Sequence, residues 1–217
     1  MKRNNKILIS LVINILVFLF VIIGTILVYT IKDSALVAKG FAILKYFTFQ
    51  SNVFMGVVSL IIAIYQILIL KGKKDKIPHI LTIFNFVGVV AVSVTFLVVV
   101  TLLGPLYGYG LMYGGANLFY HALLPLFAIG NYLFLEDNDF NFKWTFLGPV
   151  SVFLYGIVYL SNVAALNAYG DLKVDFYGFG QQGLGFGILY FIILLLLTYG
   201  FGVLIYYINR LVFKKRR

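Results

Sequence analysis

Six long apolar stretches, separated by short polar or glycine-rich segments, occupy nearly all of the 217-residue chain. They fall at residues 7–30, 46–70, 77–103, 116–135, 144–164 and 185–209. Each is close to the roughly 20 residues with which a helix crosses a hydrocarbon core about 30 Å thick. Since 62% of the residues are hydrophobic and 11% are charged, a soluble fold would lack polar surface. The sequence predicts an all-α, multi-pass protein of the cell membrane, one bundle of six transmembrane helices over residues 1–217.

Lysine and arginine are unevenly distributed between the two sides of this predicted bundle. If the helices alternate in direction, one side carries both termini, the segment KGKKDK at 71–76 and Lys143. The other side carries only Lys32, Lys39, Lys45 and Lys173. Because cytoplasmic segments are enriched in Lys and Arg, the bias predicts that both termini are cytoplasmic. The net charge of +10 is thus a signal of topology, and we expect no nucleic-acid partner because no folded basic domain carries it.

Residue types that common cofactor and metal sites require are missing or misplaced. The chain has no cysteine, which excludes disulfides and thiolate metal sites. His79 is predicted on the cytoplasmic side, a membrane thickness from Thr48, so we expect no metal and no other cofactor. The glycine-rich passages at 108–115 and 178–187 lack the preceding strand and the lysine of a phosphate-binding loop. Their tyrosines and phenylalanines are typical of the aromatic belt at a membrane interface.

The polar residues within the apolar stretches are neutral and gather near the outer ends of three of them. The span centres contain no Asp, Glu, Lys or Arg, which removes the usual carriers of proton-coupled transport. Thr48 and Asn52 share a face at the start of the second span, and Asn117 and His121 share one in the fourth. Asn162 closes the fifth span. These residues are predicted to lie at comparable depth.

Pro125 lies four residues after His121 and has no backbone N–H, so the helix is predicted to bend at His121 and to free its carbonyl for a polar pocket. The same residues also have a structural interpretation, because a lone intramembrane Thr bonds its own helix and a lone His bridges helices. Asn14 and Asn85, inside the first and third spans, are predicted to bond neighbouring helices rather than a ligand.

Two short stretches carry a family resemblance. The sequence K-Y-F-T-F-Q-S-N at 45–52, followed by N-x-x-x-H-x-x-x-P at 117–125, resembles the bacterial Pr6Pr membrane proteins. It is more distantly similar to the androgen-induced six-span hydrolases of fatty acid esters of hydroxy fatty acids. In those hydrolases a threonine at the start of the second span and a histidine in the fourth are required, and they match Thr48 and His121. The resemblance covers most of the chain in architecture and these two stretches in residues.

This resemblance implies a catalytic pair with a clear physical basis. A threonine hydroxyl needs a neighbouring base to become a nucleophile, and a neutral imidazole is the strong candidate in this region. Thr48 would attack the ester carbonyl, and His121 would accept the proton and return it to the leaving alcohol. The candidate donors to the oxyanion or the substrate are Asn52, Asn117, Tyr120 and Asn162.

No carboxylate neighbours Thr48 or His121 in the sequence, so the group that would orient His121 stays open. An amide, a backbone carbonyl, or Asp171 or Asp175 from the segment 165–184 would serve. That segment is too short for a core of its own and is predicted to pack over the helix ends. Its two acids are otherwise interpreted as ordinary solvated charges.

Two functions therefore remain open. One is an intramembrane lipid or fatty-ester hydrolase that acts on a hydrophobic ester substrate. The other is a non-enzymatic integral membrane protein, a small-molecule carrier or a scaffold, in which the clusters around Thr48 and His121 hold helices together. Membrane lipids are partners in both, and the oligomeric state is left open. They differ in whether the Thr48 hydroxyl reaches His121 and whether a lipid-sized cavity opens beside the pair.

Overall fold

The structure is a computed structural model that describes residues 3–30, 40–137 and 141–214. Within these ranges the chain is helical and contains no β-strand. The α-helices are α1 (Arg3–Thr30), α2 (Phe47–Leu70), α3 (His79–Val98), α4 (Gly104–Tyr107), α5 (Tyr109–Met112), α6 (Ala116–Leu118), α7 (Leu124–Phe134), α8 (Val150–Ala165) and α9 (Leu184–Lys214). Two π-helices (Val99–Leu103, Phe119–Leu123) and two 3₁₀-helices (Gly40–Lys45, Phe142–Leu147) join them.

Five helical segments of the described chain are long and apolar enough to cross a membrane. They are Arg3–Thr30, Phe47–Leu70, His79–Tyr107, Phe142–Ala165 and Leu184–Phe213. Each lies within a few residues of a predicted stretch, so the all-α fold class is confirmed together with five helices of spanning length. The remaining predicted stretch, 116–135, is built from α6, a π-helix and α7 and is not one of the five.

Each of the two π-helices ends two residues before a proline. In the first, the Gly104 N–H donates to the Val99 carbonyl, and in the second the Leu124 N–H donates to the Phe119 carbonyl, each reaching back five residues. Pro105 and Pro125 follow directly, and since proline has no N–H, the usual four-residue spacing of hydrogen bonds is interrupted there. The irregularity predicted at His121 is therefore present as a π-helix that contains it.

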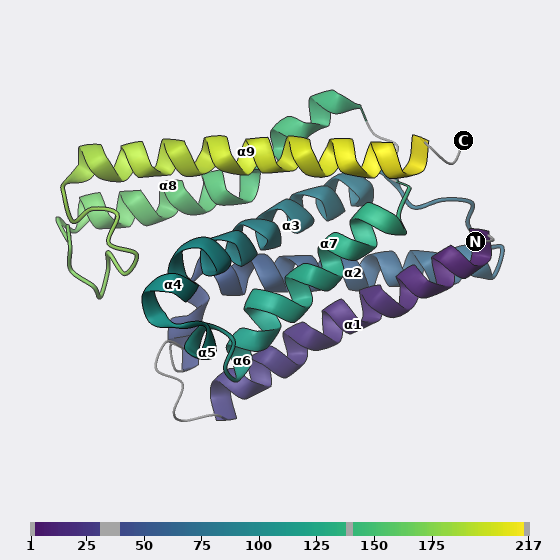
Figure 1. Cartoon of the computed structure of the whole chain (residues 1–217), viewed down its shortest axis with the longest axis horizontal. Coiled ribbons are helices and arrows are strands. Elements are labelled where there is room, and N and C mark those ends of the chain that lie inside the picture. The colour runs from purple at the N-terminus through teal and green to yellow at the C-terminus, as the bar shows by residue number, and fades with distance from the viewer. Residues whose placement is uncertain (1–2, 31–39, 138–140, 215–217) are drawn as a thin grey trace.

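Figure 1 shows α8 and α9 lying along each other across one side of the group formed by α1, α2, α3 and α7. The central helix is α3, whose side chains are continuously buried over residues 85–95. Its burial comes from contacts with α2, α7, α8 and α9, which surround it. The loop of residues 166–183 lies at one end of α8 and α9 and contacts both α8 and the start of α2.

The start of α1, the segment 71–78 between α2 and α3, and the end of α9 lie at one end of the bundle, which we call the charged end. The Arg3 guanidinium donates to the Asp75 carbonyl there, at 3.1 Å. The opposite end carries α4, α5 and the 166–183 loop, and we call it the loop end. All of the predicted site residues lie toward the loop end.

Candidate functional site

The turns that carry Thr48 and His121 are neighbours, joined by Asn52. The Asn52 side-chain amide donates to the Thr48 carbonyl at 2.7 Å and to the Tyr120 carbonyl at 3.2 Å. Since one nitrogen makes both bonds, the start of α2 and the π-helix of residues 119–123 are held against each other. Asn52 is fully buried, so breaking this link would leave its side-chain N–H groups without acceptors in an apolar interior.

His121 is oriented by a backbone carbonyl, one of the groups left open by the sequence. Its Nδ1 lies 3.0 Å from the Met112 carbonyl oxygen. Because a carbonyl only accepts, Nδ1 carries the hydrogen of the neutral ring and Nε2 is left as the acceptor. Within the described chain, however, the Thr48 hydroxyl and the His121 ring form no hydrogen bond with each other.

The candidate donors to an oxyanion are largely engaged elsewhere. Asn117 donates to the Leu111 carbonyl at 3.3 Å. Thr25 donates its hydroxyl hydrogen to the Val21 carbonyl at 2.7 Å, so the Tyr120 hydroxyl, 2.9 Å away, is the donor toward Thr25. Asn162 is exposed on α8, away from these residues in the fold. The four candidates therefore do not converge on one point.

A separate cavity of about 590 Å³ lies between α2 and α8 near the loop end, and we call it the lateral groove. Its walls come from α2 and α8, and the start of α2 and the 166–183 loop close its head. The volume falls within the range of roughly 300–1,000 Å³ typical of small-molecule sites. Among its lining residues are Ser51, Phe54, Leu154, Tyr155, Val158 and Phe176.

The lateral groove opens along the side of the bundle. Leu154 and Val158 line it and are nevertheless 59% and 62% exposed, so its α8 wall faces the surroundings. Apolar side chains exposed on a helix of spanning length are suited to hydrocarbon rather than water. An apolar chain from the surrounding membrane is therefore the kind of molecule that has direct access.

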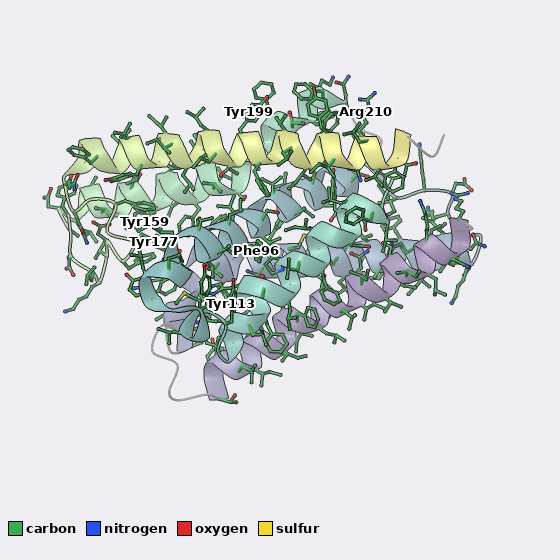
Figure 2. All side chains as sticks on the ribbon, in the orientation of Figure 1. Phe96, Tyr113, Tyr159, Tyr177, Tyr199 and Arg210 are labelled. Carbon is green, nitrogen blue, oxygen red and sulfur yellow. The ribbon has the colours of Figure 1, made fainter. Side chains whose placement is uncertain are left out.

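Tyrosines fasten the head of the lateral groove. The Tyr155 hydroxyl on α8 donates to the Lys45 carbonyl, and the Phe47 backbone N–H donates to the Tyr177 hydroxyl at 3.0 Å. Figure 2 shows Tyr159 and Tyr177 together where the loop folds back on α8. The predicted packing of this loop over the helix ends is confirmed.

Asp175 is the residue that organises the loop, and its interpretation as a solvated charge is wrong. Its side chain is fully buried and accepts hydrogen bonds from the Tyr159 hydroxyl and from the Gly170 and Gly180 N–H groups, the last two at 2.9 Å each. A carboxylate with three donors is stabilised in a buried position. Asp171 is exposed and accepts from the Lys173 N–H at 2.9 Å, so neither acid orients His121.

Neither Thr48 nor His121 lines the lateral groove. The α8 wall of the groove, which includes Leu154 and Val158, was not predicted. A sequence does not distinguish an apolar residue that faces lipid from an apolar residue that lines a groove. Asn162 is the one predicted candidate that lines it. A signal was available in the tyrosines at 155, 159 and 177, which join one span to the following loop.

A second polar centre, also missed, surrounds Glu136 at the charged end. The buried Glu136 carboxylate accepts from Asn14 at 3.1 Å, Asn131 at 2.9 Å and Ser10 at 3.2 Å, and also from Asn85. These donors come from α1, α3 and α7. The prediction that Asn14 and Asn85 bond neighbouring helices is thus confirmed, with a carboxylate as the shared acceptor.

Glu136 lies just beyond the end of α7, at the base of a cavity of about 440 Å³ that Ser10 and Gln66 also line. Burial raises the pKa of the Glu136 carboxyl, and the hydrogen bonds from Asn14, Asn85, Ser10 and Asn131 oppose that rise. In the part of the chain that the structure describes, no three His, Cys, Asp or Glu residues are grouped as a metal site would require.

Comparison with known proteins gives no relative for this chain: no family model matches it, and no curated protein or solved structure matches it significantly.

Proposed function

We propose that the chain is a six-span membrane protein, with both termini cytoplasmic, that binds the acyl chain of a membrane amphiphile in the lateral groove and acts as a non-enzymatic carrier. The observation that carries the proposal is a cavity of about 590 Å³ whose apolar α8 wall is open to the side of the bundle. A cavity of this kind admits a lipid chain without passage through water.

The positions of the chain ends support six spans. The start of α1 and the end of α9 lie at the same end of the bundle, which requires an even number of crossings. The segment formed by α6, its π-helix and α7 covers residues 116–134, close to the length of one crossing, and supplies the sixth.

The described basic residues support a cytoplasmic charged end. Arg3, Lys6, Lys143, Arg210, Lys214 and the lysines of 71–76 belong to it, whereas Lys45 and Lys173 belong to the loop end. The other residues used for the predicted bias, Lys2, Lys32, Lys39, Lys215, Arg216 and Arg217, lie outside the described ranges.

Photo-crosslinking tests the lipid-binding proposal. The purified protein in nanodiscs is irradiated with a phosphatidylcholine that bears a diazirine on one acyl chain, and the labelled residues are mapped by mass spectrometry. We expect labels concentrated on Phe54, Leu154 and Val158. Labels spread evenly over the exposed apolar residues of α9 would overturn the proposal.

A matched pair of variants sharpens this experiment. Val158→Trp adds bulk inside the lateral groove and is expected to remove most of the labelling of Phe54 and Leu154. Leu196→Trp adds the same bulk on α9, where Leu196 is 66% exposed and does not line the groove. We expect it to leave the labelling unchanged.

A second candidate function is the intramembrane ester hydrolase, with Thr48 as nucleophile and His121 as base. The observation that favours it is the orientation of the His121 ring by the Met112 carbonyl, which leaves Nε2 as a proton acceptor beside the turn of Thr48. The family resemblance at 45–52 and 117–125 points the same way. For catalysis, a movement of the two helices around a bound ester would have to bring the Thr48 hydroxyl within hydrogen-bond distance of His121 Nε2.

A fluorophosphonate probe directed at activated hydroxyl groups tests the hydrolase. If it is correct, the probe labels the wild type, and both Thr48→Ala and His121→Ala abolish labelling, because residues that act as one unit are lost together. A Thr198→Ala variant, whose hydroxyl bonds to the Leu194 carbonyl within α9, serves as the control. Equal labelling of the wild type and the Thr48→Ala variant would contradict this candidate.

A further inference from the structure

The head of the lateral groove is lined by two lysines, Lys45 at the end of the 3₁₀-helix before α2 and Lys173 in the 166–183 loop. The rest of the described loop end has few charges, and its acidic residues are Asp171 and Asp175. Lys45 and Lys173 therefore determine the charge at the point where the apolar groove ends.

Lys45 is held in place by aromatic faces. Its ammonium nitrogen lies 4.4 Å from the centre of the Phe176 ring and 5.4 Å from that of Tyr46, and it donates to the Lys173 carbonyl at 3.4 Å. These contacts orient the ammonium while leaving its charge in place, because rings and carbonyls attract a cation without neutralising it.

The carboxylates nearby are directed elsewhere. Asp171 accepts from the Lys173 backbone N–H, and Asp175 is buried against Tyr159 and two backbone N–H groups. Within the described residues, neither the Lys45 nor the Lys173 ammonium forms an ion pair with an Asp or Glu. Two positive charges thus border an apolar groove without an ion-pair partner among the described residues.

From this charge complementarity we infer that the lateral groove binds an anionic phospholipid of the surrounding bilayer, with one acyl chain between α2 and α8 and the phosphate on Lys45 and Lys173. The inference rests on the proposed function and adds the head group to it. A bilayer lipid is the source that fits, because the groove opens sideways, where its apolar wall meets hydrocarbon. A second acyl chain would remain in the bilayer.

The test compares two photoactivatable lipids with the same diazirine chain, phosphatidylglycerol and phosphatidylcholine, in nanodiscs of phosphatidylcholine. We expect phosphatidylglycerol to label Leu154 and Val158 several-fold more strongly. Each lysine near a charged lipid surface contributes a preference of roughly fivefold. Lys45→Gln combined with Lys173→Gln is therefore expected to reduce phosphatidylglycerol labelling to the phosphatidylcholine level. Lys143→Gln, at the charged end, is the control and should keep the preference.

The outcomes separate this inference from the proposed function. Equal groove labelling by both lipids would overturn the head-group inference and leave lipid binding intact. An absence of groove labelling by either lipid would contradict both. A preference for phosphatidylglycerol that survives the double lysine change would overturn the assignment of an anionic phospholipid to these lysines. The assignment would also be overturned if free palmitate removed that preference while unlabelled phosphatidylglycerol did not.

Discussion

Glu136 ties together helices that are far apart in the sequence. Its carboxylate accepts side-chain donors from α1, α3 and α7, and its backbone carbonyl accepts from Asn209 of α9 at 2.9 Å. Gln66 of α2 joins through Ser10 at 2.8 Å and Asn14 at 3.1 Å. Removing the carboxylate would leave buried donors unpaired, each at a cost of about 1–3 kcal/mol.

The burial of Glu136 makes stability depend on pH in a definite direction. Its folded pKa is raised above the ordinary value of 4.5, so between the two pKa values the folded state retains a proton that the unfolded chain has lost. The contribution of Glu136 is therefore fully present below the unfolded value and is lost as pH rises through the folded one. Thermal unfolding midpoints of the detergent-solubilised wild type should fall over this interval.

Glu136→Gln should remove this part of the pH dependence, because an amide does not titrate. Asp171→Asn, at an exposed loop position, should retain it. If the wild type and Glu136→Gln show the same dependence of the midpoint on pH between about 4.5 and 8, the account of Glu136 is wrong.

At the scale of elements, the 166–183 loop owes its shape to Asp175. Asp175→Ala removes the shared acceptor of Tyr159, Gly170 and Gly180. The loop should then open more often, so that trypsin can bind the backbone around Lys173. Asp171→Ala loses one exposed contact and is the matched control. We expect faster cleavage after Lys173 only in Asp175→Ala, and equal rates in the two variants would contradict the anchoring role.

Whether each of these elements could be predicted depends on how far apart in the sequence its interacting residues lie. The long apolar helices were predictable because length and hydropathy are local properties, and so was the irregular turn at His121, since Pro125 removes a local donor. The buried state of Asp175 was not, because it depends on Tyr159, a residue of the preceding helix. Glu136 was missed for the same reason: its donors lie on separate helices, and the first acid of the polar segment EDND after an apolar stretch resembles a loop charge.

The candidate site was predictable only in part. The sequence indicates that Thr48, Asn52 and His121 lie at comparable depth in two spans, and in the structure Asn52 joins the turns that carry Thr48 and His121. The lateral groove was beyond prediction, because it arises where α2 and α8, separated in the sequence by α3 and α7, meet the 166–183 loop. The prediction of a Thr48–His121 catalytic pair stays a prediction.

For the whole molecule, the proposed topology requires the charged end to be cytoplasmic. The chain has no cysteine, so single cysteines introduced at Lys73 and at Leu172, which is 67% exposed, report on the two ends without further changes. A membrane-impermeant maleimide added to intact cells should label Leu172→Cys and spare Lys73→Cys until the membrane is permeabilised. The cysteine-free wild type is the control, and labelling of Lys73→Cys in intact cells would contradict the proposed topology.

Native mass spectrometry of the protein released from detergent micelles measures most directly whether the lateral groove holds a membrane lipid. If the groove holds a lipid, we expect the mass of one bound lipid on the wild type and on Leu196→Trp. We expect the Val158→Trp variant to have lost that lipid. Equal lipid retention by all three proteins, or none on the wild type, would contradict this expectation.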